Sequence, residues 1–377
     1  MVYDIDPLCY PDDFSLLILG SKKLQNLKLH WSPRMRDSGE ESTNLLTIFG
    51  RCMAARYAVP LKRLAVYNLY TRFHSEAFND VVDHITQTEV TVINSLDSSD
   101  PMTVFLDNVW KVNHRKHIPV NLKMLRVDNV DSEGAAMLSR FSGLERLYLV
   151  SKRPNKHLFK AHSAATVPST PLAVTPGATN STESCNGTPT ATDHTLCSSA
   201  SDYLAAIQTH HRTIRHLLLS DRWQLSDDAF FKLCQSCPNL EQLGLSCLMP
   251  PLESLRQFMA MLPKLWALRF LVAPNTDLAD KMASIDTEMH KFAVATEFWR
   301  PEYRNLKYVS MDDRHVYKLG EVYFPPKADG ESSNDMGNTM NARRSGPIRR
   351  VDEINIEDME HVEIWAMDTT EFDPAFP

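Results

Sequence analysis

Residues 214–270 read IRHLLLSDRWQLSDDAFFKLCQSCPNLEQLGLSCLMPPLESLRQFMAMLPKLWALRF, and this stretch decides the fold. It carries the apolar pattern Leu-x-x-Leu-x-Leu, in conservative variants, three times. The copies begin at Ile214, Leu240 and Leu265, which are 26 and 25 residues apart (240 minus 214, 265 minus 240). In each copy the last two apolar residues point to the same side of a short strand, and a lone strand cannot bury them. The copies therefore predict parallel strands that stack side by side over one apolar core.

Helix signals lie between these strands. Ser226 is a predicted N-cap, and Asp227 and Asp228 suit the positive end of the helix dipole. The apolar residues that follow recur at helical spacing, and Pro238 ends the helix. The next unit repeats this order and ends at Pro263. One strand and one helix in each unit predict a curved α/β repeat structure.

These residues also carry a family resemblance. LSDDAFFKLCQSCPNLEQLGLSC (225–247) resembles the cysteine-containing leucine-rich repeat that is typical of F-box proteins. With its degenerate repeats and its low-complexity insert, the whole chain resembles the leucine-rich-repeat region of fungal F-box proteins. The resemblance implies a substrate-recognition surface in a cullin–RING ubiquitin ligase of the SCF type, with the F-box-binding adaptor and a cullin as partners. The first repeat pattern begins at Leu24, and we expect no F-box ahead of it.

Further copies of the pattern extend the repeat in both directions. They predict strands at Leu24, Leu27 and Leu29; Leu61, Leu64 and Val66; Val90 and Val92; Leu122, Leu125 and Val127; Leu144, Leu147 and Leu149; Leu306, Val309 and Met311; and Met359, Val362 and Ile364. The apolar run at 14–19 is either part of a first helix or a cap over the end of the sheet. We therefore expect an irregular leucine-rich-repeat solenoid of the α/β class, with a curved parallel sheet on its concave side, helices on its convex side and disordered insertions.

Composition divides the chain. Residues 1–161 form an N-terminal repeat segment with a cap, and residues 202–377 form a C-terminal repeat segment. Between them, residues 162–201 are rich in Ser, Thr, Pro and Ala and cannot bury enough apolar surface to offset their ordering entropy, so they predict a disordered insert. Residues 327–347 predict a second, flexible loop. The insert holds three Thr-Pro dipeptides, which are candidate sites for proline-directed kinases unless the insert is a passive linker: Thr170, Thr175 and Thr188.

Charge and composition exclude several classes of protein. The net charge of -7 argues against a general nucleic-acid binder. No apolar run approaches the length of a membrane span, and the seven cysteines are too few for a disulfide scaffold. We expect no membrane partner, no cofactor and a reducing cytoplasmic or nuclear setting.

Two groups of residues could carry chemistry. Cys234 and Cys237 have redox or zinc spacing, but their predicted helix face favours core packing. His210, His211 and His216 invite a metal hypothesis, yet no acids or thiols visibly join them. No phosphate-binding glycine loop or nucleophile motif is present, so we expect neither a metal site nor enzymatic activity.

The residues between the leucines point away from the core, onto the concave face. Arg, Tyr and Trp dominate binding energy at protein interfaces, so these positions predict a protein-binding face, whose candidate residues are Lys28, Arg63, Tyr67, Arg126, Arg146, Tyr148, Arg269, Tyr308 and Trp365. Residues 352–373 contain nine acids and no Lys or Arg, which predicts a face polarised from basic to acidic. The bland alternative is a set of ordinary solvated strand positions.

Three hypotheses for function follow. The first is non-catalytic protein recognition as a substrate receptor of a ubiquitin ligase. The second is a leucine-rich-repeat scaffold or regulatory protein with no link to ubiquitin. The third is an enzyme that uses the cysteine or histidine clusters, and it requires those side chains to meet in one cleft.

Overall fold

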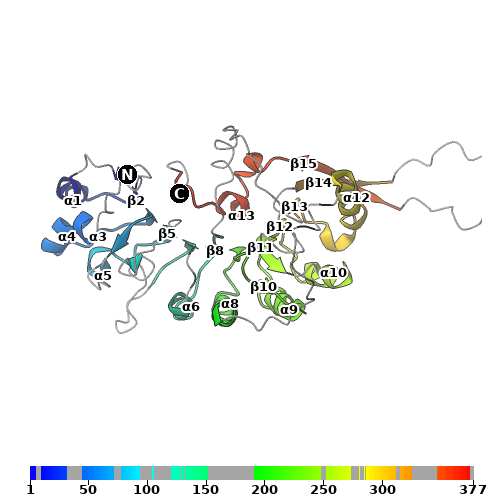
Figure 1. Ribbon diagram of the computed structural model, residues 1–377, viewed down its shortest axis with the longest axis horizontal. Helices are drawn as coiled ribbons and strands as arrows, with labels where there is room; N and C mark the ends of the chain where they lie inside the picture. The colour runs from blue at the N-terminus through cyan, green and yellow to red at the C-terminus, as the bar shows by residue number, and fades with distance from the viewer. Residues whose placement is uncertain are drawn as a thin grey trace, which may run out of the picture.

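The computed structural model describes residues 1–5, 10–31, 45–71, 78–93, 104–105, 120–128, 130, 132–151, 191–247, 252–272, 280, 284, 286–310, 315–324 and 346–373. Within these residues the protein is a mixed α/β structure built on one open, mostly parallel sheet (Figure 1). A separate pair of short antiparallel strands, β4 (Tyr70–Thr71) and β6 (Val104–Phe105), lies outside the main sheet. The predicted α/β class is confirmed.

The strands of the main sheet follow chain order. Neighbours are parallel from the first strand to the tenth, and the last two strands pair antiparallel. The path is β1 (Val2–Ile5), β2 (Asn26–Trp31), β3 (Arg63–Tyr67), β5 (Glu89–Ile93), β7 (Met124–Val127), β8 (Arg146–Leu149), β9 (His216–Leu218), β11 (Gln242–Cys247), β12 (Ala267–Phe270), β13 (Tyr308–Ser310), β14 (Val316–Tyr323) and β15 (Ile348–Ile354), with β10 (Gln224–Leu225) beside β11.

Equivalent positions of the repeat pattern pair across the sheet. Leu217, Leu243 and Leu268 are direct partners on consecutive strands, and the same row runs from Leu27 to Val309. These residues are buried in the main apolar core, which lies between the sheet and the helices. The predicted strand register is confirmed for β2, β3, β5, β7, β8, β9, β11 and β12, because equal spacing in the sequence places equal residues side by side.

Helices line one side of the sheet (Figure 1). They are α1 (Pro11–Gly20), α3 (Leu45–Ile48), α4 (Gly50–Ala54), α5 (Phe78–Val81), α6 (Ser132–Leu138), α8 (Ala191–Thr209), α9 (Asp227–Ser236), α10 (Leu252–Ala260) and α12 (Thr287–Glu297), with the 3-10 turn η2 (Pro301–Tyr303). The predicted N-cap of α9 is confirmed, because the Ser226 hydroxyl accepts a hydrogen bond from the Ala229 amide at 3.3 Å. Phe230, Leu233 and Cys234 are buried on the face of α9 that packs on the sheet.

Asparagine side chains tie consecutive units together ahead of their strands. The Asn239 amide donates to the Arg212 carbonyl at 3.1 Å, and the Asn305 amide donates to the Pro263 carbonyl at 2.6 Å. Each asparagine directly precedes the first apolar residue of its pattern, Leu240 or Leu306. These bonds satisfy carbonyls between units that the sheet itself does not reach.

The structure corrects several expectations. The strand predicted at Met359, Val362 and Ile364 is wrong: this segment forms the turn η3 (Ile356–Met359) and the short helix α13 (Glu363–Ala366). Strands β1, β14 and β15 were not predicted. The apolar run at 14–19 belongs to α1, with Phe14 and Ile18 buried.

The predicted insert and loop fall mainly outside the described residues. Helix α8 begins at Ala191, so residues 191–201 are helical and not part of a disordered insert. Residues 162–190 lie outside the described residues, and so do Thr170, Thr175 and Thr188. Of the loop predicted at 327–347, only Gly346 and Pro347 are described.

Candidate protein-interaction face

The face of the sheet opposite the helices, here called the strand face, carries eight of the nine predicted binding residues. Two register rows contain seven of them: Arg63, Arg146 and Tyr308 share the row of Glu89 and His216, and Lys28, Arg126, Tyr148 and Arg269 share the next row on this face. Tyr67 lies at the end of β3. The ninth residue, Trp365, is not on a strand; it lies in α13.

The C-terminal segment, residues 356–373, covers this face. Figure 1 shows α13 on the side of the sheet opposite α6, α8 and α9. Five of its apolar side chains are buried against strand-face residues Met124, Tyr148, Leu218 and Ala267: Met359, Val362, Ile364, Trp365 and Met367. The predicted polarity of the face therefore needs correction, because the acids of this segment lie over the basic strands instead of beside them.

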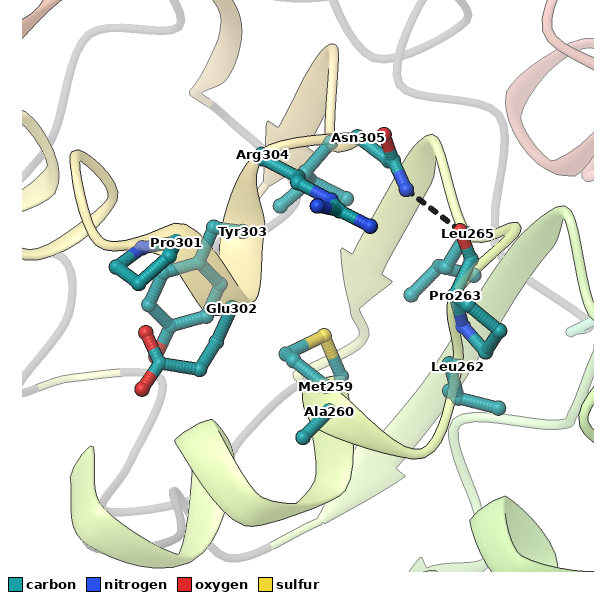
Figure 2. Close-up of a pocket in the computed structure, with 11 residues that line it drawn as sticks. Met259, Ala260, Leu262, Pro263, Leu265, Pro301, Glu302, Tyr303, Arg304 and Asn305 are labelled. Carbon is teal, nitrogen blue, oxygen red and sulfur yellow. Dashed lines mark hydrogen bonds between the residues drawn. The ribbon is translucent and has the colours of Figure 1, made fainter.

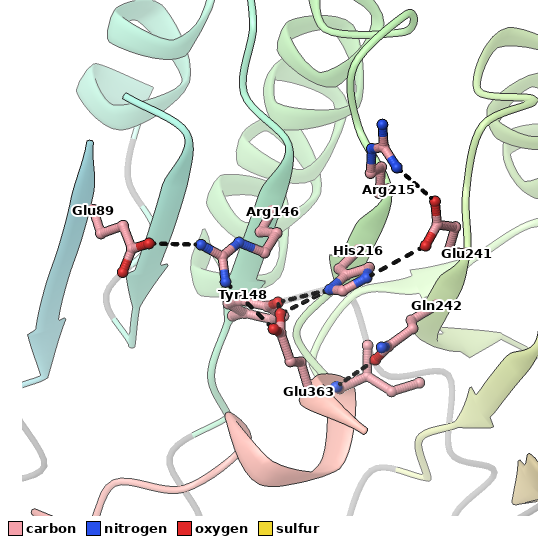
Figure 3. Close-up of polar contacts among 9 residues, drawn as sticks. Glu89, Arg146, Tyr148, Arg215, His216, Glu241, Gln242 and Glu363 are labelled. Atoms are coloured by element: carbon pink, nitrogen blue, oxygen red, sulfur yellow. Dashed lines mark hydrogen bonds and ion pairs between the residues drawn. The ribbon is translucent and has the colours of Figure 1, made fainter. Parts of the chain in front are cut away.

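Glu363 lies at the centre of the contact between the C-terminal segment and the strands (Figure 3). Its carboxylate pairs with His216 Nδ1 at 2.7 Å and with Arg146 at 3.3 Å, and it accepts the hydroxyl of Tyr148. Arg146 also pairs with Glu89 at 2.8 Å. Four strand residues from β5, β8 and β9 thus form one charged network with a helix that follows β9 by more than a hundred residues.

The network sets the protonation of its members. Burial alone would raise the pKa of Glu363, but hydrogen bonds from His216 and Tyr148 and the charge of Arg146 lower this pKa to about 2. Burial and the adjacent Glu363 carboxylate raise the pKa of Tyr148, so its hydroxyl stays protonated and donates. Glu363 is thus held ionised and Tyr148 is held neutral. Their contact is structural, because neither group has a pKa suited to proton transfer near neutral pH.

Two buried arginines bind the backbone of the C-terminal segment. Arg126 is 1% exposed; its guanidinium donates to the carbonyls of Met367 (2.9 Å) and Thr369 and to the Tyr67 hydroxyl (2.8 Å). Arg269 donates to the Ile364 carbonyl at 2.8 Å and pairs with Asp368 at 2.8 Å. These contacts supply the acceptors that a buried guanidinium requires.

The end of the segment reaches the N-terminal strands. The Phe372 ring stacks on His30 with centroids 4.4 Å apart and meets the Tyr67 ring edge-on at 5.1 Å. Lys28 Nζ donates to the Asp373 carbonyl at 3.3 Å. The segment therefore crosses the strand face from β13 to β2.

Four predicted binding residues keep exposed surface on the strand face, namely Lys28, Arg63, Arg146 and Tyr308. The Arg63 side chain is 47% exposed and pairs with Glu89 at 3.0 Å. Tyr308 is half-buried, bonded to His361 at 3.0 Å and beside Trp266 at a ring distance of 6.0 Å. The prediction missed Glu89, Asp368 and Phe372, and the signal that could have found the last two was the acidic C-terminal run.

The candidate chemistry residues do not meet in a cleft. Cys234 and Cys237 are buried in the main core, and burial raises the pKa of both thiols. His210 accepts from the Leu144 amide and bonds the Leu138 carbonyl, while burial lowers its pKa, so it is a neutral core residue. His216 belongs to the Glu363 network. Within the described ranges, no three or more His, Cys, Asp or Glu residues are placed to hold a metal ion.

A pocket between α10 and η2 is shown in Figure 2. Its volume is about 130 Å³, and its lining includes Met259, Leu262 and Tyr303, with the Asn305–Pro263 hydrogen bond at one side. Pockets for small-molecule ligands are typically about 300–1,000 Å³. At about 130 Å³ this pocket is smaller than that range. No helix in the described part of the chain is long and apolar enough to cross a membrane.

Two comparisons with known proteins found no match. The chain matches no protein-family model, and no curated protein matches its sequence.

Proposed function

We propose that this chain is a non-catalytic leucine-rich-repeat recognition protein, and that it acts as an F-box/leucine-rich-repeat-like substrate receptor of an SCF-type ubiquitin ligase. The observation that carries the recognition role is the row of equivalent residues along the sheet. A repeat stack of this kind presents one continuous strand surface, which suits an extended protein segment. The ligase assignment rests on the resemblance of residues 225–247 to the cysteine-containing repeat.

The proposed binding surface combines strand residues with the segment that crosses them. Arg146, Tyr148 and Arg269 already contact residues of the C-terminal segment, so they shape the surface from beneath. Arg63 and Tyr308 retain exposed atoms at its two ends. Arginine and tyrosine at such positions contribute to binding because they combine large contact area with directed hydrogen bonds.

Affinity purification of the tagged full chain from its native cells, followed by mass spectrometry, tests the proposal. We expect the F-box-binding adaptor and a cullin among the enriched proteins. A reproducible set of partners without these subunits would favour a scaffold that has no link to ubiquitin.

Matched variants locate the surface. Arg63→Glu combined with Tyr308→Ala should reduce recovery of the substrate proteins while leaving the adaptor and cullin in place. The control is Phe231→Ala with Lys232→Glu, two exposed positions on α9 on the helix side. Equal loss with both double variants would contradict binding through the strand face.

A further inference from the structure

The C-terminal segment consists of two parts that differ in burial. Residues 359–367 bury their apolar side chains in a cluster with the strands. Residues 369–373 are half-buried or exposed, and Phe372 is the member that packs on an apolar strand cluster. Loss of the second part would leave the first cluster intact. Residues 369–373 can therefore leave the strands while the apolar cluster of residues 359–367 keeps its contacts.

Beneath residues 369–373 lies a surface with a distinct chemistry. Lys28 and Arg126 supply positive charge, and the rings of His30 and Tyr67 form a slot for a planar side chain. Arg63 lies on β3 two residues before Ala65, the register partner of Lys28, and its charge acts on Lys28. We call these five residues the β2–β7 site.

The β2–β7 site contacts residues 369–373 mainly through features that other protein segments also have. The site takes the carbonyls of Thr369 and Asp373, one aromatic ring, and the charge of the flanking Asp373 carboxylate, which acts on Lys28. The apolar contact of residues 369–373 is that of a single ring, Phe372, which packs on a small strand cluster. A foreign segment with an aromatic residue between acidic ones can make the same contacts.

We propose that the β2–β7 site is a peptide-binding site for an extended acidic segment of a partner protein that carries one aromatic residue, and that residues 369–373 are its internal occupant. This inference rests on the proposed recognition function and names the class of ligand. A tethered occupant competes at an effective concentration of the order of millimolar, so partner binding requires displacement of this end. Charge complementarity favours an acidic partner over a basic or neutral one.

A peptide of residues 367–373 (MDTTEFD), labelled with fluorescein at its N-terminus, is the probe. It is titrated with the full chain carrying Phe372→Ala, with wild type, and with Phe324→Ala, a change at a 76% exposed ring directly after β14. We expect the Phe372→Ala chain to bind about tenfold more tightly than the other two, because its own end competes less. Equal anisotropy curves for all three chains would overturn the proposal.

Further variants distinguish a change in peptide binding from a loss of folding. Asp373→Lys removes the carboxylate whose charge acts on Lys28 and should also open the site, with unchanged circular dichroism. In the Phe372→Ala chain, His30→Ala should weaken peptide binding at least about fivefold, whereas the exposed His211→Ala should not. Peptide binding that ignores His30→Ala would place the ligand elsewhere and contradict the proposal.

The outcomes separate this inference from the proposed function. If the peptide fails to bind but the wild-type chain still recovers adaptor, cullin and substrates, recognition uses another surface and the β2–β7 site is refuted. If the peptide binds and no ligase subunits are recovered, the site stands and the ubiquitin role falls. Dimers of the wild-type chain that disappear in Phe372→Ala would identify the occupant as a second copy and overturn the partner proposal.

Discussion

Replacement of Glu363 by glutamine tests how strongly the C-terminal segment is held to the strands. The substitution keeps the shape of the side chain but removes the charge that faces His216, Tyr148 and Arg146. A pKa lowered from 4.5 to about 2 corresponds to at most about 3.5 kcal/mol, at roughly 1.4 kcal/mol for each tenfold change in proton affinity. Because 27% of the side chain is exposed, solvent screening reduces this value, and we expect a loss of about 1–2 kcal/mol.

The same reasoning predicts a pH dependence. The folded-state pKa of Glu363 lies below its unfolded value, so the carboxylate contributes fully above about pH 5 and its contribution is lost as the pH falls toward about 2. The stability difference between wild type and Glu363→Gln should therefore shrink to less than about half by pH 3. Urea unfolding followed by circular dichroism, at pH 7 and at the lowest pH where both chains remain folded, measures this difference.

Glu371→Gln is the matched control, since this residue is exposed on the same segment and should change stability by less than about 0.5 kcal/mol. Identical unfolding midpoints for wild type and both variants would refute the role of the network. A loss in Glu363→Gln that stays constant between neutral and acid pH would also refute it, because the effect would then come from packing and not from charge.

Three other predictions concern the repeat stack. Leu243→Asp places an unpaired charge at a position that is 0% exposed and should abolish cooperative unfolding as seen by circular dichroism; a wild-type melting curve would refute the register. Asn305→Ala removes the 2.6 Å bond to the Pro263 carbonyl and should lower stability by about 1 kcal/mol in urea unfolding. Cys234 and Cys237, buried and with raised pKa, should react with iodoacetamide only after denaturant is added, as mass spectrometry of the labelled peptides can show; labelling of the native chain would contradict their core position.

The strand register was predictable because the information is local. Leu217, Leu243 and Leu268 occupy the same place in their units, and each unit contacts mainly its neighbours. The helix signals were local too, as the Ser226 cap of α9 shows. Units of near-equal length leave little freedom in how they stack, so spacing alone indicated which residues would be partners.

The C-terminal segment was not predictable in the same way. Met359, Val362 and Ile364 match the spacing of a repeat strand, but two short helical turns bury the same three residues. Three apolar positions do not distinguish these conformations, because neither periodicity repeats within so short a run. The partner of this segment lies far away in sequence: Glu363 contacts Arg146, 217 residues earlier.

Arg126 shows what the pattern on the strand face does and does not encode. Its register partners are Thr91 and Tyr148, which leave most of its guanidinium donors without acceptors from the sheet. A buried arginine at such a position therefore requires acceptors from another segment, and this much follows from the repeat pattern. The carbonyls of Met367 and Thr369 supply them here, from the same chain. Backbone carbonyls leave no mark in a sequence, so the residues of the face indicate that something covers them, while only the structure identifies what does.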